Sequence, residues 1–272
     1  SLIMQMVRMG QTLIQKYPTI RRVGIASAGP LHPQKGVLLD PTNFFSNGRS
    51  WGKVALTQPL SKKLRKPVFL ENDAAASILA EAWVGAAKKT SNAMILTLGT
   101  GLGTGIICNG ELVRSGRHLH PEAGHLILDA NDQTALCGCG NFGCAEAYLS
   151  GSNFEKRFNH MYKKKFKAPL TAAEITELAL KKNHTALKAF DDYADHMATA
   201  IHNYVVLYSP QLVLFTGSFS QALPLFLPRT QKNLKKLLSR RRVGEDLLPQ
   251  FKKAHLDNDA GLIGGAFIAF SR

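Results

Sequence analysis

Three of the four cysteines in this 272-residue chain lie within eight positions of one another, in the segment Cys137-Gly-Cys139-Gly-Asn-Phe-Gly-Cys144. Disulfide-bonded domains use more cysteines and spread them more widely. Three thiolates and one imidazole form a closed tetrahedral site for structural zinc, and the intervening glycines let the backbone bend so that the thiols converge. The spacing therefore predicts a structural Zn²⁺ site, with a group of buried, reduced cysteines as the alternative.

The fourth ligand of this site is not decided by spacing. His118, His120 and His125 all precede the cysteines and compete for the role. A zinc finger that binds nucleic acid is disfavoured, because such fingers use two separated pairs of ligands.

The chain is strongly basic, with 34 Lys and Arg residues against 19 Asp and Glu and a formal net charge of +15. A charge of this size attracts polyanions. The basic residues cluster at 163–167, 232–242 and 252–253, without the interleaved aromatic residues that would stack on bases. We interpret the clusters as solvated faces, with a broad nonspecific affinity for polyanions as the alternative.

No apolar run approaches the ~20 residues that are needed to span a bilayer. The apolar residues at the start of the chain are interrupted by Gln5, Arg8 and Gly10, which argues against a signal peptide. We therefore expect a cytoplasmic protein that does not bind membranes.

Short apolar runs alternate with longer segments of helical periodicity along the chain. Strands are predicted at 23–28, 68–70, 93–98, 105–108 and 212–215, and helices at 2–17, 54–64, 74–87, 145–161, 171–182, 185–208, 220–238 and 260–270. Residues 31–50 are rich in Pro, Gly, Asn and Ser and are predicted to form a loop. The alternation predicts an α/β fold.

A glycine-rich segment, Gly99 to Gly105, follows one of the apolar strands. Glycines there expose backbone N–H groups that can bind phosphate oxygens, and Thr100 and Thr104 add hydroxyl donors. The segment lacks the Lys of a Walker loop. A tight hairpin turn explains the same residues equally well.

The tripeptide Glu71-Asn72-Asp73 lies where a predicted strand ends and a predicted helix begins. Active sites of α/β proteins form at such strand ends, and a carboxylate there could accept a proton from a substrate hydroxyl. The alternative is that Asp73 is an ordinary helix N-cap.

Two further carboxylates flank the predicted metal site. Glu122 precedes His125 by three positions, and Glu146 follows Cys144 by two. Beside an imidazole that a metal holds in place, the two carboxylates could bind the hydroxyl groups of a polyol. Taken singly, each could be a surface acid.

Together and in this order, the motifs resemble the ROK family of bacterial sugar kinases and sugar-responsive repressors. Four segments carry the resemblance: Glu71-Asn72-Asp73-Ala74, Leu98 to Gly105, Glu122 to His125, and Cys137 to Glu146. It extends to Gly29-Pro30 and to residues 43–52, 212–217 and 260–266, and so covers nearly the whole chain.

The resemblance implies an α/β fold of the actin-like ATPase (ribonuclease H-like) type, with two lobes around a cleft. We expect a small lobe at residues 1–90, onto which a C-terminal helix at 258–272 packs back. The large lobe would span residues 91–257 and carry the zinc-binding loop.

Family kinases begin with a strand that carries an Asp-x-Gly-Gly-Thr phosphate loop, whereas this chain starts after that region. We expect the N-terminal strands of the first lobe to be missing from this chain because it is part of a longer protein. A short protein that binds ATP poorly, or one with a DNA-binding helix-turn-helix in that place, are the alternatives.

The resemblance also implies roles for individual residues. Asp73 would be the catalytic base that takes the proton from a sugar hydroxyl. The sugar would contact Asn43, Asn72, Asp73, Glu122, His125 and Glu146. The nucleotide would contact Gly99, Thr100, Gly101, Gly103, Thr104 and Gly217, although Thr216 stands where many family kinases have another glycine. His125 would join Cys137, Cys139 and Cys144 as the fourth zinc ligand.

The function implied is phosphorylation of a hexose, of the glucose or N-acetylhexosamine class, by a homodimer with ATP and Mg²⁺ as phosphoryl donor. The intact Asp73 and glycine segment favour it. A sugar-responsive transcriptional regulator, which the basic charge favours, and a sugar-binding protein without kinase activity are the alternatives. Nucleic acid is not expected as a partner unless a regulator module precedes this chain.

Overall fold

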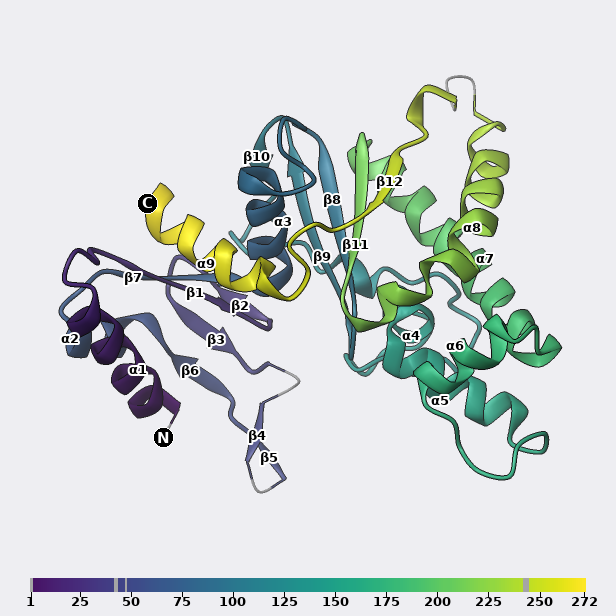
Figure 1. Ribbon diagram of the computed structural model, residues 1–272, viewed down its shortest axis with the longest axis horizontal. Coiled ribbons are helices and arrows are strands. Elements are labelled where there is room, and N and C mark those ends of the chain that lie inside the picture. The colour runs from purple at the N-terminus through teal and green to yellow at the C-terminus, as the bar shows by residue number, and fades with distance from the viewer. Residues whose placement is uncertain (1, 42–43, 47, 242–244) are drawn as a thin grey trace.

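The computed structural model describes residues 2–41, 44–46, 48–241 and 245–272 (Figure 1). Its strands and helices form two groups, each with its own sheets and hydrophobic core. The groups meet where α3 (Asp73–Val84) lies between the two sets of strands. Among the described helices, none has both the length and the apolar character to cross a membrane.

The N-terminal group contains α1 (Leu2–Lys16), β1 (Val23–Ser27), β2 (Leu31–His32), β3 (Val37–Leu39), β4 (Phe45–Ser46), β5 (Arg49–Ser50), β6 (Lys53–Ala55), α2 (Thr57–Leu64) and β7 (Val68–Asn72). Within the described residues, β1 pairs in parallel with β7, from Val23 opposite Val68 to Ser27 opposite Asn72. Both strands therefore end at one edge, and this edge brings Gly29, which follows β1, close to Asn72 and Asp73.

The predicted loop at 31–50 is wrong. β2, β3 and β6 form an antiparallel sheet, and β4 pairs with β5. Leu31 and Leu38 explain the sheet, because each is 1% exposed and belongs to the core of this group. The helix predicted at 54–64 begins only at Thr57, because Val54 belongs to β6.

The second group is built on the strands β8 (Ala93–Leu98), β9 (Leu102–Cys108), β10 (Glu111–Leu112), β11 (Leu212–Thr216) and β12 (Gln250–Lys253). The described strands lie in the order β10-β9-β8-β11-β12, with β8, β11 and β12 parallel. The sequence did not predict β12, because an edge strand that exposes Gln250, Lys252 and Lys253 lacks an apolar pattern.

Helices and short 3₁₀ segments of the second group cover this sheet. They are η1 (Ala123–His125), α4 (Ala145–Leu149), α5 (Gly151–Tyr162), α6 (Ala172–Leu180), α7 (His184–Tyr208), η2 (Ser218–Ala222), α8 (Leu223–Leu238), η3 (Glu245–Leu247) and η4 (Asp257–Asp259). The basic side chains at 163–167, 232–241 and 252–253 are exposed, which agrees with the interpretation of these clusters as solvated.

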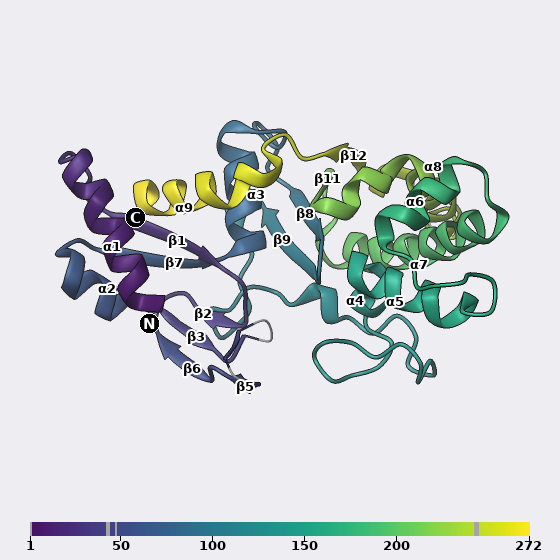
Figure 2. The same ribbon diagram turned by 60° about the horizontal axis from the view of Figure 1, so that its bottom comes forward.

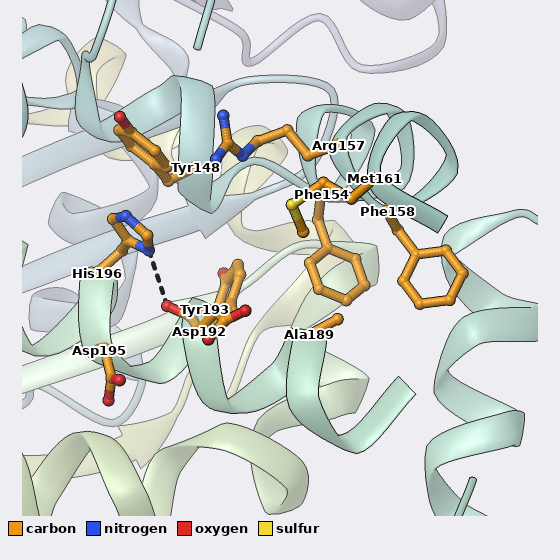
Figure 3. Close-up of a pocket in the computed structure, with 10 residues that line it drawn as sticks. All are labelled: Tyr148, Phe154, Arg157, Phe158, Met161, Ala189, Asp192, Tyr193, Asp195 and His196. Atoms are coloured by element: carbon orange, nitrogen blue, oxygen red, sulfur yellow. Dashed lines mark hydrogen bonds between the residues drawn. The ribbon is translucent and has the colours of Figure 1, made fainter. Parts of the chain in front are cut away.

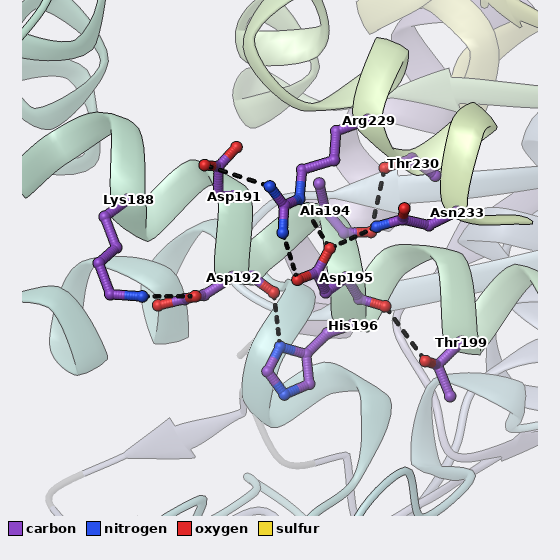
Figure 4. A network of polar contacts seen from close by, with 10 residues as sticks. All are labelled: Lys188, Asp191, Asp192, Ala194, Asp195, His196, Thr199, Arg229, Thr230 and Asn233. Atoms are coloured by element: carbon purple, nitrogen blue, oxygen red, sulfur yellow. Dashed lines mark hydrogen bonds and ion pairs between the residues drawn. The ribbon is translucent and has the colours of Figure 1, made fainter. Parts of the chain in front are cut away.

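A polar network joins α7 to α8 (Figure 4). Arg229 of α8 donates from Nε and Nη2 to the two carboxylate oxygens of Asp195, both at 2.8 Å, and lies 3.3 Å from Asp191. Asn233 donates to the same Asp195 carboxylate. The Arg229 and Asp195 side chains are each 44% exposed, so this network lies on the solvent-facing side of the two helices.

The C-terminal helix α9 (Ala260–Ser271) packs against β1 and α3 at main-chain distance, as both views show (Figures 1 and 2). A Cβ on Gly24 would lie 1.8 Å from the carbonyl oxygen of Gly265, and one on Gly264 would lie 2.1 Å from that of Ala76. Only glycine allows this approach. The residue boundaries of the two lobes stay a prediction.

We predict that Gly264→Ala destabilises the protein by roughly 1–3 kcal/mol, because its methyl group would meet backbone that cannot move aside. Gly261→Ala is the matched control in the same helix. Nothing lies within 4 Å of its Cβ position, and alanine there should be neutral or stabilise the helix by up to about 1 kcal/mol. Urea denaturation measures both, and equal stabilities would contradict the close packing of α9.

Candidate active site

A cleft of about 350 Å³ lies between the two groups of strands. Its lining contains most of the residues that the sequence singled out: Asn72, Asp73, Gly99, Thr100, Gly101, Gly103, Thr104, Glu122, His125, Glu146 and Gly217. Ala28, Gly29, Pro30 and His120 also line it. Asn43 lies outside the described residues. The structure thus brings together segments that are separated by more than one hundred positions in the chain.

Asn72 and Asp73 reach the cleft from the junction of β7 and α3. Asn72 is the N-cap of α3, and its Oδ1 accepts hydrogen bonds from the backbone N–H groups of Ala74 and Ala75 at 3.0 and 3.1 Å. The capping alternative considered for Asp73 therefore belongs to Asn72. With Oδ1 occupied, the Asn72 amide presents its NH₂ group as a donor.

Asp73 is the first residue of α3, and its carboxyl group faces the open cleft. Its Oδ1 accepts from the backbone N–H of Ala74 at 2.8 Å. Burial against the cleft wall raises the pKa of Asp73 above its ordinary value of 3.8, while the Ala74 N–H and the nearby His120 oppose the rise. A carboxylate with a raised pKa is a stronger base than an ordinary aspartate.

The opposite wall of the cleft carries Glu122 and His120. Oε1 of Glu122 lies 3.2 Å from Nε2 of His120, whose side chain is 6% exposed. Burial acts to raise the pKa of Glu122, but the hydrogen bond and charge of His120 and the charge of His125 lower it overall. Glu122 therefore faces the cleft as a carboxylate.

This wall is held by β9 and by α7. A Cβ on Gly124 would lie 2.2 Å from the carbonyl oxygen of Leu102, so η1 packs directly on the β9 backbone. The hydroxyl of buried Tyr204 donates to the carbonyl of Ala123 at 2.9 Å. These contacts explain why the segment from Glu122 to His125 contains two small residues.

The sequence indicates His120 only as a candidate metal ligand and does not predict that it lines the cleft. It lies beside Gly29, where a Cβ would come within 3.0 Å of His120 and 3.4 Å of both Asn72 and Glu122. Its Nδ1 is buried and has no hydrogen-bond partner among the described residues. No signal in the sequence separates His120 from His118, which lies two positions away.

The glycine segment is a hairpin turn that also lines the cleft. Leu98 pairs with Leu102, and the Gly99 N–H donates to the Gly101 carbonyl at 3.1 Å. The turn is therefore shorter than predicted, because Gly103, Thr104 and Gly105 belong to β9. The Gly99 carbonyl accepts from the Gly151 N–H at the start of α5 at 2.9 Å, which fixes the turn.

A second cavity, of about 430 Å³, shares Gly99 and Thr100 with the cleft. It continues between the start of α5, the start of α6 and η2, where it is lined by Gly151, Ser152, Ala172, Thr176, Ser218 and Phe219, among others. Gly217 stands at its edge with a φ of 88°, and a Cβ there would lie 2.5 Å from the carbonyl oxygen of Leu98. The glycine turn therefore borders both cavities.

His125, Cys137, Cys139 and Cys144 form a cluster whose ligand atoms all lie within 4.8 Å of one another. Nδ1 of His125 is 3.4 Å from Sγ of Cys137, and the sulfurs of Cys139 and Cys144 are 3.8 Å apart and not bonded. Gly140 and Gly143 have φ values of 92° and 72°, which the fold-back of this loop requires. The cluster could hold a metal ion, and its three sulfurs and one nitrogen suit zinc.

Glu146 connects this cluster to the glycine turn. Its Oε2 accepts from the backbone N–H of Leu102 at 3.0 Å, and its Oε1 accepts from the Cys137 thiol at 3.2 Å. A change at the cysteine cluster therefore acts directly on a carboxylate of the cleft.

The loop that carries the cysteines is anchored by Tyr148 and Arg157, two residues that line a smaller cavity of about 190 Å³ (Figure 3). The Tyr148 hydroxyl donates to Asp132 at 2.9 Å, and Arg157 lies 3.4 Å from the same carboxylate. Burial acts to raise the pKa of Asp132, but hydrogen bonds from Thr134 and Tyr148 and the charge of Arg157 lower it to about 2. The ring of Tyr148 stacks on His196 with centroids 4.0 Å apart.

Comparison with known proteins decides the family. The sequence model of the ROK family matches residues 1–272. The chain belongs to the ROK family.

Relatives of this ROK protein include sugar kinases. It is 31% identical over 267 residues to a glucokinase of Thermotoga maritima, covering 92% of this chain and 79% of the relative. It is 30% identical over 254 residues to an N-acetyl-D-glucosamine kinase of Escherichia coli, covering 90% and 79%.

Solved structures agree on the fold. A ROK hexokinase from Thermus thermophilus superposes with a TM-score of 0.84 and 25% identity, covering 99% of this chain and 85% of the other. A ROK family transcriptional regulator, a homologue of the E. coli MLC protein, superposes with a TM-score of 0.82 and 20% identity over 98% and 67%. This ROK protein therefore has the mixed α/β, actin-like ATPase fold of the ROK sugar kinases.

We predict that the ROK protein binds one zinc ion per chain, and that Cys139→Ser or a mild chelator weakens sugar binding before the fold is lost. The physical reason is that His125 belongs to the cluster and also lines the cleft, and that Glu146, which bonds the glycine turn, follows the ligand Cys144 by two residues. Elemental analysis measures the metal, and calorimetry with glucose and N-acetylglucosamine measures binding. Cys108→Ser, at a cysteine outside the cluster, is the control. Loss of zinc with unchanged sugar affinity would make the metal purely structural.

Proposed function

We propose that this ROK protein transfers the γ-phosphoryl group of ATP to a hydroxyl group of a hexose of the glucose or N-acetylhexosamine class. One observation carries the proposal: Asp73, with its raised pKa, lines a single cleft together with the glycine turn, Glu122 and His125. The kinase names of its relatives support the same conclusion.

The polar groups of the cleft suit a polyhydroxy substrate. Asp73 and Glu122 offer carboxylate acceptors, and the Asn72 NH₂ group offers a donor beside the space that Gly29 leaves open. Glu146 and His125 would complete the binding set at the end near the cysteine cluster. Acceptors outnumber donors here, and a sugar, whose hydroxyls all donate, satisfies such a site.

The two cavities that border the glycine turn suit the nucleotide. The nucleoside would occupy the cavity beside α5, α6 and η2, and the phosphates would pass the turn at Gly99, Thr100 and Gly101, where Thr100 and Gly101 offer backbone N–H groups and Thr100 adds its hydroxyl. Gly103, Thr104 and Gly217 line the same path. When bound, ATP with Mg²⁺ supplies the phosphoryl group and neutralises the charge that develops during transfer.

In the proposed reaction, the residues of this chain orient the sugar and move one proton. Asn72 and Glu122 hold sugar hydroxyls so that the reacting oxygen lies beside Asp73. Asp73 takes the proton from that hydroxyl as the oxygen attacks the phosphoryl group. Most of the acceleration comes from positioning and electrostatic stabilisation. The homodimeric state and the cytoplasmic location stay predictions.

We predict that Asp73→Asn lowers kcat by at least about 10²-fold while the sugar still binds. The same substitution should raise the thermal midpoint at pH 7. Because the pKa of Asp73 is higher in the folded than in the unfolded chain, its charge costs stability at neutral pH, and that cost vanishes at pH values where both states are protonated. A coupled assay and thermal denaturation measure the two effects. Glu111→Gln, at an exposed residue of β10, is the control. Undiminished turnover in Asp73→Asn would refute its role.

We also predict that kcat/KM falls on the acid side with an apparent pKa above 3.8, because activity is lost as Asp73 is protonated and its pKa is raised. In His120→Gln this acid limb should move to higher pH, since the charge of His120 lowers the pKa of Asp73. His196→Gln, at a histidine outside the cleft, should leave the limb in place. A pH profile that does not move in His120→Gln would contradict the coupling of His120 to Asp73.

A further inference from the structure

We propose that Glu71 and Arg114 are a positioning pair that holds the two walls of the candidate sugar site in register. The proposal deepens the proposed function and rests on it for the identity of the ligand. Neither residue lines the cleft, so the pair acts through the residues that do.

Glu71 lies on β7, directly before Asn72 and Asp73, and its side chain is 1% exposed. Its Oε1 accepts from the backbone N–H of Asn72 at 3.0 Å and from Nη1 of Arg114 at 3.2 Å, and its Oε2 accepts from Nη2 of Arg114. The buried carboxylate thus bonds both the peptide that leads into the Asn72–Asp73 wall and a guanidinium from the segment that follows β10.

Arg114 stands at the start of the segment that carries the other wall. The preceding residue, Val113, still bonds to β9, with its N–H donating to the Ile106 carbonyl at 2.9 Å. The chain then turns, with the Ser115 N–H donating to the Leu119 carbonyl at 2.8 Å, and continues to His120 and Glu122. At the far end of this segment, the Thr104 hydroxyl donates to the Pro121 carbonyl at 3.2 Å. Arg114 therefore fixes the near end of the segment that presents His120 and Glu122.

A buried ion pair is poor evidence for added stability, because the cost of removing two charges from water offsets their attraction. Its geometry offers a different benefit. The two-pronged contact of a guanidinium with a carboxylate fixes direction as well as distance, which a lysine cannot do. Here that direction sets how the segment at 114–122 meets the Asn72–Asp73 peptide.

The network of Arg229 and Asp195 provides a matched comparison (Figure 4). It is also two-pronged, with both contacts at 2.8 Å, but it is 44% exposed on both sides and joins two helices away from the cleft. Loss of that pair should affect stability and leave the sugar site unchanged.

The test compares Arg114→Lys and Glu71→Gln with Arg229→Lys in the same chain. Arg114→Lys keeps the positive charge and removes the two-pronged geometry. We expect it to raise the sugar KM and lower kcat, together by roughly tenfold or more in kcat/KM, with the KM for ATP within about twofold of wild type. Glu71→Gln should do the same. Arg229→Lys should lower the thermal midpoint without moving either KM.

A second measurement needs no turnover. Amide hydrogen exchange, followed by mass spectrometry, should be faster at 113–122 in Arg114→Lys and unchanged at 95–107. If a single variant does not fold, Glu71→Gln/Arg114→Gln removes both charges and leaves no unpaired buried ion. A raised sugar KM in that double variant supports the proposal.

The outcomes separate this proposal from the proposed function. If the wild-type chain phosphorylates no hexose, the proposed function fails. The role of the Glu71–Arg114 pair is then still tested by calorimetry with glucose or N-acetylglucosamine and by amide exchange. Wild-type sugar binding and wild-type exchange at 113–122 in both Arg114→Lys and Glu71→Gln would overturn it. A wild-type sugar KM in Arg114→Lys would also overturn the proposal, because the positive charge without the two-pronged contact would then be sufficient.

Discussion

The main-chain surface of the β8–β9 hairpin is the constraint on which the rest of the site depends. α3 packs on it so closely that a Cβ at Gly105 would lie 2.3 Å from the carbonyl oxygen of Ala74. η1 packs on Leu102, Glu146 bonds the N–H of the same residue, and the start of α5 bonds Gly99. In each of these contacts at least one partner is backbone, which cannot rotate aside as a side chain can. The hairpin therefore fixes the position of each wall of the cleft.

Charge in the cleft opposes the charge of the whole molecule. The chain carries a formal +15, yet Asp73, Glu122 and Glu146 converge in one cleft. His120 lies beside Glu122 and acts to lower the pKa of both Glu122 and Asp73. The carboxylates suit the hydroxyl groups of a sugar and the glycine turn suits phosphate, so the two proposed substrates would be recognised by different chemistry.

The cysteine cluster would position residues of the cleft, and a metal ion held by it would not bind substrate. With four protein ligands, a tetrahedral metal has no open position for substrate. Its effect would pass through His125, which lines the cleft, and through Cys144, the N-cap of the helix α4 that carries Glu146, so the metal would brace two residues of the cleft at once. The anchor of the same loop at Asp132, formed by Tyr148 and Arg157, limits how far that brace can shift.

The sequence by itself determined the types of the functional groups and the family, because motif residues such as Asp73 and the three clustered cysteines lie close together along the chain. It also predicted most strands and helices, where apolar periodicity is strong. Only the tertiary structure decided that Asn72 caps α3, and that residues 31–32 and 37–39 form strands. It alone paired Glu71 with Arg114, 43 positions away. Such contacts depend on how β7 and β9 are placed in space, and local sequence carries no record of a partner brought close by the fold.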